Sequence, residues 1–421
     1  MTDPSTLQPG VKRFIGIDFD FGALRRSGPK YWMWVSLLGI FVVMGVLSWT
    51  QLLSHGGAVV GMRDSYPWGL WFTNYMYYVG LSAGGLVVYA SVHLFGAEQY
   101  RPLSRLAVLQ AGILVMMALL GILSDMERPW RMIWFMLTPN PTSPFLFTGS
   151  AAGAYMVLCF IDLWVLISGK GGEKLAVRMT LIALPLAIYL HTTTAFVLVL
   201  NKSRELWHTA VLVPIFLTSA TASGIALLFI FAYLVQWLSP IKFKPSMFRS
   251  LATLLATVII LDLFLLLVEM ITVFWPTSSM PGHTIRMMEF FTGGYAFAFL
   301  PVLFLGVIAF ILLVRRSTRH IPAVQITAAV MYVIAIWLKR YSLMAMGFAR
   351  DTLGQLTGVY VPSMVETFLA LGILAFGLLF VTLAVKILPM AVPEHEHDEE
   401  IDQLLDASVT EPALEAEVES L

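Results

Sequence analysis

Residues 68–95 read WGLWFTNYMYYVGLSAGGLVVYASVHLF and contain no Asp, Glu, Lys or Arg. An α-helix needs about 20 apolar residues to cross the roughly 30 Å hydrocarbon core of a bilayer, so this stretch predicts a transmembrane helix. With nine similar stretches it gives ten candidate spans: 31–53, 68–95, 103–124, 146–168, 175–200, 207–237, 247–275, 293–314, 321–341 and 363–388. Their apolar residues cover all sides of a helix and do not alternate as in the strands of a membrane barrel. We therefore predict an all-α polytopic membrane protein.

The composition supports this class. Of 421 residues, 58% are hydrophobic and 12% are charged, about half the charge of a typical soluble domain. All 26 basic residues lie at or before Lys386, whereas 11 of the 26 acidic residues lie between Glu394 and Glu419. We expect an N-terminal segment (1–30), a ten-helix membrane domain (31–388) and an acidic, disordered tail (389–421). The lipid bilayer, and not nucleic acid, is the expected environment.

The distribution of Lys and Arg predicts the orientation. Seventeen of these residues flank the spans on the side of both termini and nine lie on the other side. Cytoplasmic loops carry the excess of positive charge, so both termini are expected in the cytoplasm of a bacterial inner membrane. The other, periplasmic side collects most of the polar residues that could carry chemistry: His55, Asp64, Asp125, Glu127, His191, Glu205, His208, Glu269, His283 and Glu289.

A weak internal repeat relates spans two and six. Trp68 precedes Gly85 by the same spacing as Trp207 precedes Gly224, and small residues precede both glycines. Small residues allow close packing of helices, which is one explanation of the match. The other is a pair of parallel four-helix bundles, formed by helices 2–5 and 6–9 and flanked by helices 1 and 10.

Three motifs carry a family resemblance. Tyr66-Pro67-Trp68-Gly69-Leu70-Trp71, followed by Gly80-Leu81-Ser82-Ala83-Gly84-Gly85, resembles the first core helix of the polysulfide reductase (NrfD/PsrC) membrane subunits. Ser124-Asp125-Met126-Glu127-Arg128-Pro129 resembles that family's D-x-G-R-P segment, with Glu127 in place of glycine. Trp207-His208 through Ser223-Gly224 resembles the start of the second bundle. Ten helices resemble the branch found in alternative complex III and in periplasmic-facing quinone reductase complexes.

The resemblance implies the quinone-reactive membrane subunit of a multi-subunit respiratory oxidoreductase. It implies a menaquinone or ubiquinone near the periplasmic face and a ferredoxin-like iron–sulfur subunit docked there. A molybdopterin-type or multihaem cytochrome c subunit would belong to the same complex. The chain itself is expected to bind no haem and no iron–sulfur cluster. Its one cysteine, Cys159, cannot ligate a cluster alone, and His191 and His208 are not obviously at one depth.

Quinone chemistry requires hydrogen-bonding groups for two carbonyls and titratable groups for two protons. Candidates for the quinone site are Gln51, His55, Asn74, Tyr75, Tyr78, Asp125, Arg128 and Tyr155. Asp125 and His55 are the preferred proton-donating pair. His55 before Gly56-Gly57 is equally explained as a loop residue, and Asp125 as a salt-bridge partner of Arg128. Asn74 and the tyrosines also suit helix packing or the membrane interface.

Charged residues within a span are costly and are functional candidates by default. Asp262 and Glu269 are seven residues apart on one helix face and, with His191, are candidates for a proton path. Neutral, hydrogen-bonded packing residues are an equal alternative. Asp162 and His93 lie near predicted cytoplasmic helix ends, where extension of the side chain to water would suffice. The competing functions are a secondary transporter, which also suits ten helices and a repeat, and a passive anchor for a redox partner.

Overall fold

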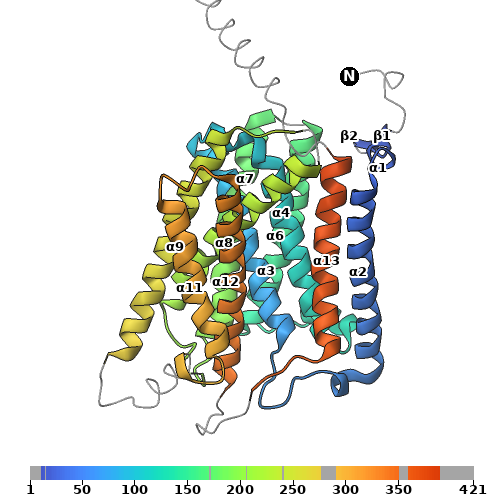
Figure 1. Cartoon of the computed structure of the whole chain (residues 1–421). Helices are drawn as coiled ribbons and strands as arrows, with labels where there is room; N and C mark the ends of the chain where they lie inside the picture. Colours follow the sequence, from blue (N-terminus) through green and yellow to red (C-terminus); the bar gives the residue numbers. More distant parts are fainter. Residues whose placement is uncertain are drawn as a thin grey trace, which may run out of the picture.

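The computed structural model describes residues 11–14, 16–169, 172–204, 206–238, 241–275, 291–349 and 359–388, and the acidic tail lies outside them. Within these residues, ten helices are long and apolar enough to cross a membrane (Figure 1). They are α2 (Pro29–His55), α3 (Leu70–Phe95), α4 (Ser104–Asp125), α6 (Pro144–Ser168), α7 (Gly172–Val199), α8 (Leu212–Leu238), α9 (Pro245–Phe274), α11 (Ala296–Val314), α12 (Pro322–Phe348) and α13 (Met364–Ile387). The predicted polytopic all-α fold is confirmed.

Nine of the predicted spans agree with the helices to within five residues, but the ninth span was predicted too short. Its helix, α12, continues to Phe348 rather than ending at 341. The charge count behind the predicted orientation included Lys339 and Arg340, near the end of this span, among the nine basic residues of the periplasmic side. In the structure both side chains are buried inside the bundle, where they have polar or charged neighbours.

Short elements join the long helices. At one end of the bundles, β1 (Val11–Phe14) pairs with β2 (Ile17–Asp20) in an antiparallel hairpin that α1 (Gly22–Arg25) follows. We call this the upper end, as drawn in Figure 1. The connection η3 (Glu98–Leu103) is also at the upper end, whereas η2 (Gly56–Val59), η4 (Pro129–Arg131) and α5 (Met132–Leu137) lie at the lower end.

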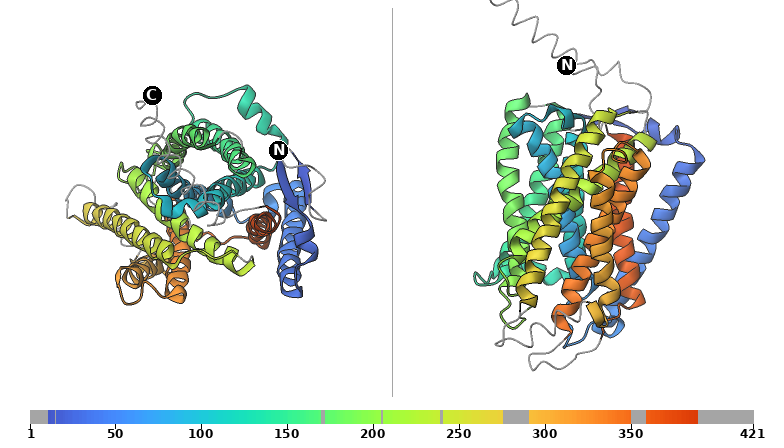
Figure 2. Two further views of the ribbon diagram at one scale, coloured as in Figure 1. Left: turned by 90° about the horizontal axis from the view of Figure 1, so that it is seen from above. Right: turned by 60° about the vertical axis from the view of Figure 1, so that its left-hand side comes forward.

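The long helices form two bundles and one flanking pair, as predicted. Helices α3, α4, α6 and α7 contact one another in a closed ring, seen end-on at the left of Figure 2. Helices α8, α9, α11 and α12 make the equivalent contacts in a second bundle. Helices α2 and α13 pack against each other, and α13 separates α2 from the bundles (Figure 1).

The two bundles meet where α3 crosses α8. Gly84 and Gly224 lie in direct backbone contact at this crossing, because a Cβ at either position would overlap the other helix. The side chain of Gln110 in α4 donates hydrogen bonds to the carbonyls of Leu81 (3.2 Å) and Gly224 (2.8 Å) and so ties three helices together. Trp68 and Trp207, equivalent in the repeat, stack at 5.8 Å.

Candidate functional site

An apolar cavity of about 670 Å³ lies between the bundles and α13. Its walls come from α3, α4, α8, α12 and α13, with Phe297 of α11 and Pro362 at the lower end. Along α13 the lining runs from Thr367 to Val381. At 1.5 Å per residue this is a length of about 20 Å, so the cavity extends from the lower end past the middle of the membrane.

The polar groups of the cavity gather near its lower end. The Trp337 indole donates a hydrogen bond of 2.9 Å to Asn74 Oδ1, and both residues line the wall. The Asn74 amide oxygen accepts this hydrogen bond, so the N–H groups of the amide nitrogen can donate to another partner. One helical turn further, the buried Tyr78 also lines the cavity, and its hydroxyl has no hydrogen-bond partner within the described residues. Two free donors four residues apart on α3 therefore face one space.

A second polar group lies just outside the cavity, at the start of α13. The fully buried carboxylate of Glu366 accepts hydrogen bonds from the Tyr360 hydroxyl (2.5 Å) and from the backbone N–H groups of Gly61 and Ser363 (2.7 Å each). The Ser363 side chain accepts from the Glu366 backbone in return, which completes a capping box. The next residue, Thr367, lines the cavity. Glu366 thus fixes the end of α13 beside the cavity's polar end.

Tyrosine hydroxyls surround this carboxylate. Burial, together with the Glu366 charge, raises the pKa of Tyr360, and burial also raises the pKa of Tyr66, which stacks on Tyr360 at 4.7 Å. Both hydroxyls therefore stay protonated at neutral pH. Tyr360 also accepts a hydrogen bond of 2.9 Å from the Leu70 backbone, so it joins the starts of α3 and α13. The sequence analysis missed Glu366 and Tyr360, although the pattern Ser363-x-x-Glu366 before an apolar run was a readable sign of a buried helix start.

Of the predicted quinone-site residues, the structure places Asn74 and Tyr78 on the cavity. Asp125 ends α4 at the lower end, close enough to Glu366 for the two charges to interact, and it makes no hydrogen bond within the described residues. Gln51 and His55 are exposed at the end of α2, where the His55 ring contacts the Gln51 carbonyl (3.1 Å). These two residues do not line the cavity.

The remaining three candidates lie elsewhere. Arg128 is exposed in the turn before η4. Tyr75 points into the first bundle, where its hydroxyl bonds Thr148 (2.9 Å). Tyr155 is also fully buried within this bundle, and its hydroxyl has no hydrogen-bond partner in the described part of the chain. The structure therefore does not bring the eight candidates together.

Asp162 and His93, expected to reach water, are buried instead. Asp162 is 1% exposed and accepts a hydrogen bond of 3.0 Å from Tyr89. The His93 side chain is 3% exposed and contacts Glu173 at 2.6 Å. Both side chains find partners within the first bundle at its upper end, so extension to the interface is not needed.

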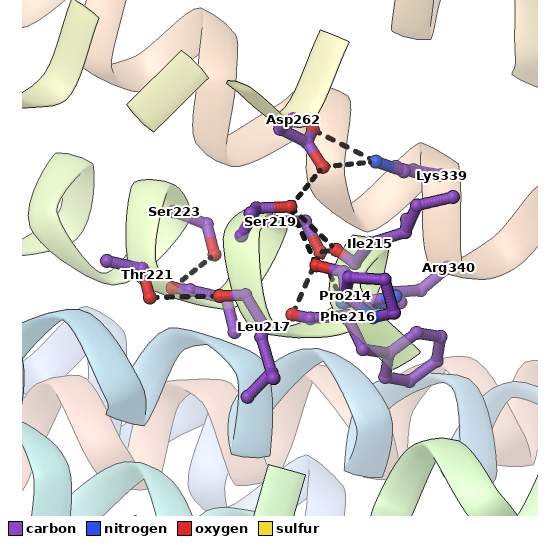
Figure 3. A network of polar contacts seen from close by, with 12 residues as sticks. Pro214, Ile215, Phe216, Leu217, Ser219, Thr221, Ser223, Asp262, Lys339 and Arg340 are labelled. Atoms are coloured by element: carbon purple, nitrogen blue, oxygen red, sulfur yellow. Dashed lines mark hydrogen bonds and ion pairs between the residues drawn. The ribbon is translucent and has the colours of Figure 1, made fainter. Parts of the chain in front are cut away.

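The predicted proton-path residues lie on either side of the junction between the bundles. His191 is in the first bundle, with its two ring nitrogens 2.6 Å from the Ala187 carbonyl and 2.8 Å from the Val79 carbonyl. Asp262 is in the second bundle and forms a buried ion pair with Lys339, at 2.7 and 2.9 Å (Figure 3).

Further polar groups complete this cluster. The Asp262 carboxylate also accepts a hydrogen bond of 2.9 Å from Tyr332. Arg340 donates to Ser219 (2.7 Å), lies 3.6 Å above the Phe216 ring and interacts electrostatically with His191. Figure 3 shows Arg340 and the ion pair on one side of α8. Lys339 and Arg340 were missed as members of this cluster because they were counted as flanking charges of the periplasmic side.

Metal ligation receives no support from the described residues: no three His, Cys, Asp or Glu side chains within them gather into a candidate metal site. Glu205, His283 and Glu289, noted above on the polar side, lie outside the described residues.

Comparison with known proteins identifies relatives along the whole membrane domain. Residues 58–350 match the profile of the family described as "Polysulphide reductase, NrfD". A Halobacterium salinarum protein, provisionally named as a membrane subunit of dimethyl sulfoxide reductase, is 26% identical, over 88% of this chain and 92% of its own. The Hdr-like menaquinol oxidoreductase integral membrane subunit of Archaeoglobus fulgidus is 24% identical, over 91% and 99%. The menaquinone reductase integral membrane subunit of Nitratidesulfovibrio vulgaris is 20% identical, over 90% and 96%.

The chain belongs to the NrfD family, as the sequence motifs predicted, and is a multi-pass integral membrane protein.

Proposed function

We propose that this member of the NrfD family is the quinone-binding membrane subunit of a respiratory oxidoreductase complex. The observation that carries the proposal is the pair of free donors, from Asn74 and Tyr78, at the polar end of the long apolar cavity. Relatives that cover nearly the same length are named as membrane subunits of menaquinol and menaquinone oxidoreductases. Both facts favour menaquinone or ubiquinone over the transported solute of a secondary transporter.

The cavity suits the two parts of a quinone. Its volume is within the range of about 300–1,000 Å³ that is usual for small-molecule sites. The ring would lie at the lower end, where the Asn74 amide and the Tyr78 hydroxyl donate to a carbonyl oxygen. The isoprenoid tail would follow α13 toward Val381 between apolar side chains. A bound quinone supplies two-electron, two-proton chemistry, so the residues near its ring need to bind it and exchange protons.

Asp125 and Glu366 lie at the lower ends of α4 and α13, two helices that line the cavity, and we assign them the exchange of protons with the lower aqueous phase. Asp125 is the better placed, because its carboxylate makes no hydrogen bond in the described part of the chain, whereas Glu366 already accepts three. His55 is exposed at the same end and would exchange protons with water rather than contact the ring.

Partners and orientation are part of the proposal. With both termini in the cytoplasm of a bacterial inner membrane, the lower end faces the periplasm. A ferredoxin-like iron–sulfur subunit would dock there and exchange electrons with the ring, and a molybdopterin-type or multihaem cytochrome c subunit would complete the complex.

The test is quinone binding to the purified complex, with turnover measured in parallel. Loss of one hydrogen bond costs about 1 kcal/mol, so Tyr78→Phe and Asn74→Leu should each weaken binding roughly fivefold. Tyr189→Phe, on the outer surface of α7, is the matched control and should bind as the wild type does. Unchanged affinity in both cavity variants would refute the site, and a complex that binds no quinone would favour the passive anchor.

Two further measurements test the proton roles. Asp125→Asn should lower turnover while leaving quinone affinity nearly unchanged, and normal turnover would remove Asp125 from the mechanism. Proton translocation through His191, Asp262 and Glu269 is a separate proposal, supported by the way Arg340 joins the two bundles. Vesicles containing the complex should then show a pH change beyond that of the quinone chemistry itself.

A further inference from the structure

One turn of α12 presents different chemistry on its two faces. Trp337, Leu338 and Tyr341 line the cavity. Lys339, on the opposite face, extends into the second bundle to Asp262, and Arg340 extends to Ser219 of α8 at the junction of the bundles (Figure 3). A single helix therefore separates the cavity from the charged cluster.

The cluster carries more positive than negative charge. Lys339, Arg340 and Asp262 are 6%, 1% and 2% exposed, so bulk water does not hydrate their charges. Asp262 balances Lys339, with which it forms the ion pair. The Nε and Nη1 atoms of Arg340 have no hydrogen-bond partner in the described part of the chain. The three residues together hold one excess positive charge, and a buried charge without a counter-charge is unfavourable.

Among the residues that the structure describes, Glu269 is the carboxylate placed to supply this counter-charge. It lines a small cavity of about 60 Å³ together with Lys339, Arg340 and Thr209, and the other described lining side chains, from α8, α9, α11, α12 and the loop before α8, carry no charge. The Thr209 hydroxyl donates a hydrogen bond of 3.2 Å to the Glu269 carboxylate. This volume holds about two water molecules, enough to join Glu269 to both cations. Glu269 is half-buried near the lower end of α9, within reach of the aqueous phase.

We propose that Glu269 is a charge-compensating group for the quinone cavity: it binds a proton when a negatively charged ligand occupies the cavity, and releases it when the ligand leaves. With Glu269 ionised, the cluster is neutral. When Glu269 takes a proton from the lower aqueous phase, the cluster carries one positive charge behind the cavity wall. This inference rests on the proposed function, because it takes the cavity as the quinone site.

The size of the effect follows from the thickness of a helix. Two unit charges about 10 Å apart, at an effective dielectric constant of about 20, interact by an energy that corresponds to roughly tenfold in affinity. An anionic ligand should therefore bind about tenfold more tightly when Glu269 is uncharged. A neutral ligand of the same shape should bind equally in both states.

The experiment compares two tailed naphthoquinones by titration calorimetry of the purified complex. The 2-hydroxy compound is an anion at neutral pH, and the 2-methyl compound is neutral. The heat of binding is measured in buffers of different ionisation enthalpy, and its dependence on that enthalpy gives the number of protons taken up per ligand bound. At a pH where Glu269 is mostly ionised, tenfold coupling predicts that the anion takes up at most about half a proton in the wild type and in the control Asp64→Asn. In Glu269→Gln it should take up none and bind more tightly, by a factor that rises toward about tenfold as the pH is raised.

The outcomes separate this inference from the proposed function. If the anion binds in the wild type and in Glu269→Gln with the same proton count and the same affinity, the inference is wrong while the quinone site stands. If neither compound binds, or Asn74→Leu leaves both affinities unchanged, the proposed function itself fails. Should Glu269→Gln not assemble, Glu269→Ala removes the same titration and must give the same result.

Discussion

The contact between Gly84 and Gly224 gives the sharpest prediction about stability. In Gly224→Ala the added Cβ would lie 2.4 Å from the Gly84 nitrogen and 2.5 Å from the Leu81 carbonyl oxygen, whereas ordinary contact begins at 3.4 Å. The α3 and α8 helices would have to separate by about 1 Å at their crossing. This movement affects the junction of the two bundles, since Gln110 bonds carbonyls of both helices there.

The expected cost combines three effects. Overpacking of a well-packed interior costs about 1–3 kcal/mol. Weakening the two Gln110 hydrogen bonds adds about 1–2 kcal/mol, since each contributes about 0.5–1.5 kcal/mol. Replacing glycine by alanine within a helix returns about 1 kcal/mol. We expect a net destabilisation of about 1–4 kcal/mol.

The measurement is unfolding of the purified protein in detergent, followed by circular dichroism during a denaturant titration. Gly153→Ala in α6 is the matched control, because its Cβ would meet nothing within 4 Å. It should leave the protein as stable as the wild type, or more stable by as much as about 1 kcal/mol. Equal stability of the two variants would refute the close crossing of α3 and α8.

Three further predictions concern buried polar groups. Lys339→Met leaves the Asp262 carboxylate unpaired and should destabilise the protein by about 3–5 kcal/mol. Most of this loss should be recovered in the double variant that also carries Asp262→Leu. Equal stability of the single and the double variant would contradict the ion pair. Glu366→Gln removes the charge that accepts three hydrogen bonds and should cost about 2–4 kcal/mol in the same unfolding assay, and a loss below about 1 kcal/mol would count against the network. Burial raises the pKa of Tyr360, so its hydroxyl ionises in the unfolded chain before it ionises in the folded protein. The buried hydroxyl therefore contributes fully to the free energy of unfolding below about pH 10, and this contribution declines as the pH rises further. Melting temperatures measured between about pH 9 and 11 should thus fall less steeply in Tyr360→Phe, and identical slopes would contradict the shift.

The fold was predictable because hydropathy alone specifies where the chain crosses a bilayer. Only α12 was predicted much too short. Lys339 and Arg340, near the end of the predicted span, were counted as periplasmic charges, whereas in the structure they are buried beside Asp262 and Ser219 and the helix continues past them. Whether a charged residue lies at the interface or inside a bundle depends on partners far away in the sequence, which no local pattern contains.

The candidate site was predictable only in part, for a similar reason. Asn74 and Tyr78 were found because they are polar residues one turn apart within an apolar helix. Tyr75 is also a polar residue in this part of α3, but its side chain points into the first bundle, where its hydroxyl bonds Thr148 of α6. Glu366 belongs to the last span, and its position beside α3 arises only from the packing of α13 against the bundles.

That packing has a consequence for biogenesis. The first transmembrane helix, α2, has most of its surface exposed and finds its close partner in the last one, α13, where Gly45 and Gly372 are in backbone contact. A ribosome-bound chain that has inserted every helix up to α12 still has an open apolar groove in place of the cavity, with α2 unpartnered beside it. Only the insertion of the final helix supplies the Thr367–Val381 wall and the Glu366 anchor. The cavity is therefore completed only when the last described helix inserts, and a chain truncated before α13 would lack that wall.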